Sequence, residues 1–212
     1  MVASDQPMNL PLSSLLLILC MSGFVQAGES VTADPVAGQS KTVVCGACHG
    51  PDGNSLVPVF PNLAGQGERY LLKQLHEIRD GKRVVPEMTG LLVSLTERDL
   101  ADIAAYYAGQ KAKRLEADPD LAAQGEALFR GGKLGQGMPA CIGCHSPRGA
   151  GIPSAGFPQL SGQHSAYIKK QLTAFRDGER SNDGETQVMR TIASKLSNGD
   201  IEALAAFIQG LE

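Results

Sequence analysis

The sequence contains no tryptophan, and aromatic residues make up only 5% of its 212 residues. Aromatic side chains contribute large buried areas to most protein cores, so this is little material for an interior of this size. The length is sufficient for one large domain or two small ones. We therefore expect a group other than side chains to fill part of the interior.

The sequence also lacks a large excess of charge of either sign and any run of basic residues. Its formal net charge is −3. This balance argues against a nucleic-acid partner and against strong binding to anionic lipid.

The longest apolar run lies near the N-terminus, at residues 10–25. It is shorter than the about 20 residues that a membrane-spanning helix needs. It ends in the small-residue pattern Val25-Gln26-Ala27, which predicts a secretory signal peptide over residues 1–27. Neither Lys nor Arg precedes the run, which departs from the usual signal pattern, and a membrane anchor is the alternative.

Only five cysteines are present, and one of them, Cys20, falls within the predicted signal peptide. Lipid attachment at Cys20 is disfavoured because the preceding residue, Leu19, is bulky. The other four form two copies of the pattern Cys-x-x-Cys-His. Two thiols at this spacing on a helical turn can bond the two vinyl groups of one haem, and the histidine then lies under the iron. The pattern predicts two covalently bound haem c groups, attached through Cys45, Cys48, Cys141 and Cys144, with His49 and His145 as iron ligands.

Three other kinds of site use similar residues. A thioredoxin-like redox pair needs a βαβ context, and no strand-rich pattern is present. A structural zinc site needs a further ligand in each half, and the remaining histidines, His76 and His164, are not at equivalent positions of the repeat. We expect both of these histidines to lie at the surface. A disulfide within each motif is the third alternative. The duplication of the whole motif favours haem.

A closed electron-transfer site needs a sixth iron ligand, and a Met thioether beside His raises the reduction potential. Met88 is the only methionine of the first half after the signal peptide, and Met189 lies at a similar place in the second half. Met138, just before Cys141, is expected to fill a gap near the haem. We predict Met88 and Met189 as axial ligands.

The two halves of the chain repeat each other beyond the motifs. Residues 61–83 and 158–180 are identical at 12 of 23 positions, and residues 95–107 align with 196–208. Two copies of roughly 90 residues indicate a duplicated domain and not a solenoid. The predicted parts are a first domain at 28–110, a polar linker at 111–120 and a second domain at 121–212.

Each half is predicted to be all-α, with three helices. The first helices begin at Asp34 and Asp118, each an N-cap residue followed by proline, and are expected to continue into the cysteine motifs. Gly38 and Gly125 lie inside them, where glycine costs about 1 kcal/mol relative to alanine. Their presence indicates a close helix–helix contact.

The second and third helices also have clear boundaries. Second helices are predicted over residues 68–79 and 165–176, each closed by a nearby glycine. Third helices begin at Thr96 and Ser197, each with an Asp three residues on, as in a capping box. Their apolar residues recur at helical spacing and are expected to form the core.

Several longer motifs recur in the same order in both halves. The first half contains CGACHGPDGN, FPNLAGQGERYLLKQL, PEMTG and DIAAYY, and the second contains CIGCHSPRGAG, FPQLSGQHSAYIKKQL, VMRTIASKLS and ALAAFI. In this combination the chain resembles the dihaem cytochrome c4 family, which has two class I cytochrome c domains in tandem. The resemblance covers about residues 34–211. One departure is the loop around Met88, which is four residues shorter than its counterpart.

The resemblance implies a periplasmic electron carrier, not an enzyme, that is monomeric and either free or loosely associated with the membrane. It implies a bc1-type donor and a terminal oxidase as acceptor. It also implies that the two domains face each other about a pseudo-twofold axis, where Tyr70, Tyr167, Arg79 and Arg176 are candidate polar contacts. Two alternatives are a cytochrome subunit of a dehydrogenase complex and a dihaem peroxidase, which would need an open iron position.

Overall fold

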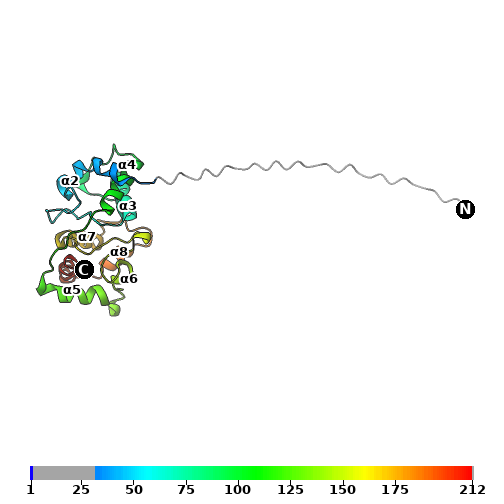
Figure 1. The fold of residues 1–212 in the computed structure, drawn as a ribbon. Helices are drawn as coiled ribbons and strands as arrows, with labels where there is room; N and C mark the ends of the chain where they lie inside the picture. Colours follow the sequence, from blue (N-terminus) through cyan, green and yellow to red (C-terminus); the bar gives the residue numbers. More distant parts are fainter. Residues whose placement is uncertain (2–31, 212) are drawn as a thin grey trace. The chain divides into compact units, whose positions relative to one another are not determined.

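The computed structural model describes Met1 and residues 32–211, which form α-helices and short 3-10 helices (Figure 1). The predicted signal peptide, with Cys20, lies outside the described residues except for Met1. Between residues 32 and 211, β-structure is limited to two isolated bridges in the second half. Over the same residues, no helix is both long enough and apolar enough to cross a membrane. The all-α prediction is confirmed.

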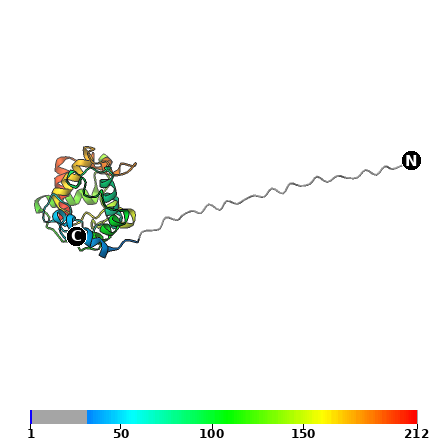
Figure 2. The same cartoon turned by 90° about the horizontal axis from the view of Figure 1, so that it is seen from above.

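The helices follow one another in the same general order in both halves. In the first half they are α1 (Pro35–Lys41), α2 (Val43–His49), α3 (Glu68–Arg79), η1 (Pro86–Met88) and α4 (Glu97–Ala108). In the second half they are α5 (Pro119–Gly131), η2 (Leu134–Gln136), α6 (Ile142–His145), η3 (Pro153–Ala155), α7 (Ser165–Arg176), α8 (Val188–Ala193) and α9 (Asn198–Gln209). Helix α4 packs on α1 and α3, and α9 packs on α5 and α7, which the colours of Figure 2 allow the reader to follow.

The first and last long helices of each half contact each other at a glycine. A Cβ atom on Gly38 would lie 2.0 Å from the carbonyl oxygen of Asp102, and one on Gly125 would lie 2.0 Å from that of Ala203. Both distances are far below van der Waals contact, so only glycine allows these helices to approach so closely. The predicted close contacts are confirmed.

The predicted helix starts are also confirmed. The Asp34 side chain accepts hydrogen bonds from two backbone N–H groups of the first turn of α1, and Asp118 caps α5. Thr96 and Ser197 each form a complete capping box with the Asp three residues on.

The expected continuation of the first helices into the cysteine motifs is wrong. Thr42 separates α1 from α2, and its hydroxyl donates to the carbonyl oxygen of Gln39 at 2.8 Å, a local bond that competes with helical pairing. In the second half, residues 132–140 separate α5 from the motif. Gly132 has a φ of 65°, which ends the helix.

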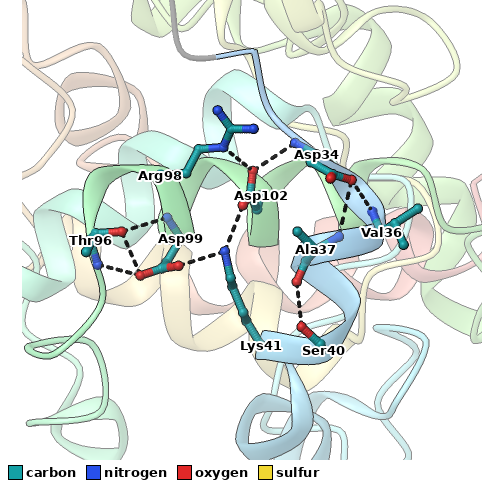
Figure 3. Close-up of polar contacts among 9 residues, drawn as sticks. All are labelled: Asp34, Val36, Ala37, Ser40, Lys41, Thr96, Arg98, Asp99 and Asp102. Atoms are coloured by element: carbon teal, nitrogen blue, oxygen red, sulfur yellow. Dashed lines mark hydrogen bonds and ion pairs between the residues drawn. The ribbon is translucent and has the colours of Figure 1, made fainter.

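The contact between α1 and α4 includes a cluster of charges around the carboxylate of Asp102 (Figure 3). This side chain is almost fully buried. Its Oδ1 accepts hydrogen bonds from the backbone N–H of Asp34 (2.8 Å) and from Nε of Arg98 (3.0 Å), and its Oδ2 accepts from Nζ of Lys41 (2.8 Å). Lys41 also pairs with Asp99 at 2.7 Å. A buried carboxylate is tolerated only when it is paired in this way, so the cluster fixes α1 against α4.

We expect this cluster to make the folded state sensitive to acid. The hydrogen bond from Lys41, opposed by desolvation, holds the pKa of Asp102 below its usual value of about 3.9. A carboxyl group with a lowered folded-state pKa stabilises the fold above its unfolded pKa, and this stabilisation is lost as the pH falls through the folded value. Asp102→Asn should therefore flatten the fall in unfolding free energy below about pH 4, measured with urea. The exposed Asp177→Asn is the control, and equal pH profiles for both variants would contradict the expectation.

Each half has its own apolar core. The first core contains Leu71, Ile103, Ala104, Tyr106 and Tyr107, with Cys45 packed against it. The second contains eleven buried residues, among them Phe129, Met138 and Ile208, with Cys141 packed against it. The first cysteine of each motif therefore adjoins the core of its own half.

Candidate functional site

Each cysteine motif lies on a short helix. In the first half, α2 carries both thiols and the imidazole. In the second half, α6 begins directly after Cys141 and carries the second thiol and the imidazole. Residues three and four positions apart share one face of a helix, and in both motifs these side chains line a single cavity.

The imidazoles of His49 and His145 are oriented by equivalent contacts. Their Nδ1 atoms lie 2.9 Å from the carbonyl oxygens of Pro61 and Pro158, respectively. A carbonyl oxygen can only accept, so each Nδ1 carries the proton and each Nε2 keeps a lone pair. Burial lowers the pKa of both imidazoles, and the hydrogen bonds only partly oppose this effect. A neutral imidazole oriented through its other nitrogen is the form that binds a metal.

The four cysteines are free thiols, so the disulfide alternative is not supported. Burial raises the pKa of the Cys45 thiol and raises that of Cys141 to about 11, which keeps both protonated at neutral pH. Among residues 32–211, no three His, Cys, Asp or Glu side chains are grouped so as to hold a metal ion.

Both predicted methionine ligands lie in the wall of the same cavity. Met88 ends η1, and the neighbouring Glu87 pairs with Lys170 of the other half at 3.2 Å. Met189 lies in α8, where the neighbouring Arg190 binds the Asp183 carboxylate at 2.7 Å. Both loops contact the opposite half, since Asn182 of the longer loop donates to the side chain of Gln74 at 2.9 Å. The longer loop also has its own internal ion pair.

The third methionine, Met138, has a different position. It is 1% exposed and packs in the core of the second half beside Cys141. Its side chain also lines the cavity, in agreement with the predicted gap-filling role.

The cavity has a volume of about 1900 Å³. Pockets for single ligands usually have about 300–1,000 Å³, so there is room for a large prosthetic group in each half. Apolar side chains from both halves form much of the wall, including Leu71, Leu75, Ile103, Leu172, Leu204 and Ile208. Apolar walls, a pair of free thiols and a neutral imidazole are the features that a covalently attached haem requires. The residues present therefore fit that group.

Two arginines at equivalent positions of the repeat, Arg83 and Arg180, connect the halves in the cavity wall. Arg83 donates a hydrogen bond to the hydroxyl of Tyr167 at 3.0 Å, and Arg180 donates to that of Tyr70 at 3.1 Å. Each also donates, at 3.1 Å, to a glutamine of the opposite half. Because these residues correspond in the repeat, the two sets of contacts are related by approximate twofold symmetry.

The predicted contacts at this interface are right for the two tyrosines and wrong for Arg79 and Arg176. Arg79 pairs with Glu97 of its own half at 2.8 Å, and Arg176 pairs with the adjacent Asp177 at 3.0 Å. Arg83 and Arg180, which do cross, lie four residues further along, where the chain has turned back beyond the end of each helix. Both pairs of arginines are identical in the repeat, so identity alone does not distinguish the pair that crosses from the pair that does not.

Two buried glutamines add a second symmetric set of contacts. Gln163 donates to the carbonyl oxygen of Asn62 at 2.9 Å and accepts from its N–H at 2.9 Å. Gln66 makes the same pair of bonds with the backbone of Gln159, at 3.0 and 2.8 Å. The bonded backbone groups directly follow the two prolines that orient the imidazoles, so the interface supports both sites.

The expected surface position of His164 is wrong. This side chain is only 7% exposed, and its Nε2 lies 3.0 Å from the carbonyl oxygen of Ser55 in the other half. Gly67 occupies the corresponding position of the first half, so the contact has no symmetric counterpart. His76 is partly exposed, and its Nε2 lies 3.0 Å from a carboxylate oxygen of Glu97.

Comparisons with known proteins agree with this geometry. The cytochrome c family model matches residues 36–110 and again residues 122–212. Cytochrome c4 of Pseudomonas aeruginosa is 63% identical over 204 residues, which cover 96% of this chain and all of the relative. This chain belongs to the cytochrome c4 family. The solved structure of reduced recombinant cytochrome c4 from Pseudomonas stutzeri, 61% identical, matches with a TM-score of 0.84 over 85% of this chain and 100% of that chain.

Membership of the cytochrome c4 family settles the general activity. Proteins of this family are electron carriers, so the chain is an electron-transfer protein and not an enzyme. Cytochrome c domains imply covalently bound haem c. A more distant relative, 32% identical over 94% of this chain and 91% of its own length, is a thiosulfate dehydrogenase electron acceptor from Thiomonas intermedia.

Proposed function

We propose that this cytochrome carries two haem c groups, one in each half, and acts as a periplasmic electron shuttle. The observation that carries the proposal is the presence, in one cavity, of two sets of paired thiols with a neutral imidazole and a methionine. When bound, each haem supplies a one-electron couple between ferric and ferrous iron. Cys45, Cys48, Cys141 and Cys144 would attach the haems, and the axial ligands would be His49 with Met88 and His145 with Met189.

The proposed organisation follows the repeat. A signal peptide at residues 1–27 is removed on export, and the linker at residues 111–120 joins a first domain at 28–110 to a second at 121–212. Support for export comes from the apolar run and the small-residue pattern that ends it.

The side chains around each site favour electron transfer over substrate chemistry. The backbone carbonyls of Pro61 and Pro158 orient the imidazoles, and Met88 and Met189 would be the second protein ligands of the two haem irons. A haem bound in this way would have no open position for peroxide, which disfavours the peroxidase alternative.

We propose a bc1-type complex as electron donor and a terminal oxidase as acceptor, in line with the family resemblance. The relative from Thiomonas intermedia favours a second candidate, in which the chain accepts electrons from a dehydrogenase. Rapid mixing of the oxidised protein with each reduced donor separates the two. The faster reduction identifies the donor.

Haem attachment can be tested one motif at a time. A chain with Cys45→Ala and Cys48→Ala should retain one covalent haem, because the thioether bonds of the second motif are untouched. The matched variant, with Cys141→Ala and Cys144→Ala, should retain the other. Haem stain and intact mass of the exported protein report the number of haems. Two haems on either variant would contradict the assignment.

A further inference from the structure

Tyr107 lies near the end of α4, with its side chain 2% exposed and in the wall of the cavity. Within the described part of the chain, its buried hydroxyl has no hydrogen-bond partner of normal geometry. The neighbouring Tyr106 differs, because its hydroxyl donates to the carbonyl oxygen of Pro51 at 3.0 Å. A buried hydroxyl without a partner is destabilising, so a partner is expected in the complete protein.

The surroundings of this hydroxyl point to the first cysteine motif. It lies beside the thiol of Cys45 and the hydroxyl of Thr42. Thr42 already donates its own hydrogen to the carbonyl oxygen of Gln39 at 2.8 Å. Burial raises the pKa of Tyr107, so the phenol remains protonated and keeps a hydrogen to donate.

The second half has no such group. The N–H of Gly65 donates to the Tyr107 carbonyl oxygen at 3.0 Å, and that of Gly162 donates to the Ile208 carbonyl oxygen at 3.3 Å. These matching bonds show that Ile208 occupies the corresponding position. Its aliphatic side chain also lines the cavity but has no polar atom. The two sites therefore differ by one hydrogen-bond donor beside the first cysteine.

We propose that Tyr107 raises the reduction potential of the first haem site alone, by donating a hydrogen bond to the Cys45 sulfur when that sulfur is bonded to haem. This inference rests on the proposed haem attachment. A thioether sulfur is a weak acceptor, and a donor dipole aimed at it withdraws electron density from the attached ring. Hydrogen bonds around a metal centre tune its potential, and here the effect favours ferrous iron. Tyr107 is thus a positioning residue that acts through Cys45.

The test compares Tyr107→Phe with Tyr106→Phe in the full protein with haem attached. Both variants lose one hydroxyl from adjacent positions of the same helix. Redox titration should be followed by NMR of the haem methyl protons, with Met189→His used to assign the signals of the second site. For Tyr107→Phe we expect the ratio of reduced to oxidised first-site haem at fixed ambient potential to fall about threefold. This corresponds to about 30 mV, since a tenfold change is 59 mV for one electron.

The second site should not shift in Tyr107→Phe, and neither site should shift in Tyr106→Phe. An unchanged or raised first-site potential in Tyr107→Phe would overturn the proposal, as would an equal shift of both sites or the same shift in Tyr106→Phe. Failure of the proposed function is a distinct result, because the unsubstituted protein would then show no covalent haem spectrum.

Discussion

Replacing Gly125 with alanine is expected to destabilise the second domain by about 3 kcal/mol, because overpacking of a tight contact has costs of this order. The new Cβ would lie 2.0 Å from the Ala203 carbonyl oxygen and 2.6 Å from Cβ of Phe207. Backbone atoms cannot move aside as a flexible side chain can, so α5 would have to separate from α9. The gain in helix propensity, about 1 kcal/mol, is too small to offset this. Urea unfolding of the protein with haem attached measures the change.

A second glycine of the same helix provides the control. A Cβ atom on Gly131 would meet no atom within 4 Å apart from its chain neighbours and the nearby backbone of its own helix. Gly131→Ala should therefore leave the unfolding free energy unchanged or raise it by up to about 1 kcal/mol. If both variants had the same stability, the close approach of α5 to α9 would not be a requirement of the fold.

Replacing Met88 with alanine is expected to lower the potential of one haem and leave the other unchanged. A thioether ligand stabilises ferrous iron, so its loss favours the ferric form and opens the sixth position. The weak long-wavelength absorption band of Met-bound ferric haem should fall to about half its intensity, as expected if one of two such ligands is lost. Optical titration of the variant measures both quantities.

The other two methionines of the cavity wall, Met189 and Met138, provide matched comparisons. Met189→Ala should have the corresponding effect on the other haem. Met138→Leu changes a core residue of similar volume and should leave the band intact, at a cost below about 1.5 kcal/mol. A full-intensity band in Met88→Ala, or its loss in Met138→Leu, would show that the ligands are assigned wrongly.

Features that depend on local sequence could be predicted well. The capping boxes at Thr96 and Ser197 involve residues only three positions apart, so they can be recognised from the sequence alone. Gly38 and Gly125 indicated a close helix contact because glycine is otherwise unfavourable inside a helix. The cysteine motifs likewise place thiols and imidazole on one helical face without any long-range information.

Features that depend on contacts between the halves were predicted less well. Arg79 and Arg83 are both identical to their counterparts in the repeat, and only the turn after α3 decides which one reaches the other half. His164 has no counterpart in the first half, so the repeat carried no signal for its contact with Ser55. One local feature was also predicted wrongly. The Thr42 hydroxyl bonds to the backbone of the preceding turn, and this bond competes with a helical pattern that would otherwise continue.

We propose that the exported protein holds two covalent haems, each bound by one histidine and one methionine. The most direct test is a redox titration of the mature protein, followed optically, on material whose intact mass has been determined. We predict a mass that includes two haems, a low-spin c-type spectrum with the Met-bound ferric band, and two positive potentials. A single haem, a high-spin component or a strongly negative potential would show that the protein does not hold two haems with histidine and methionine ligands.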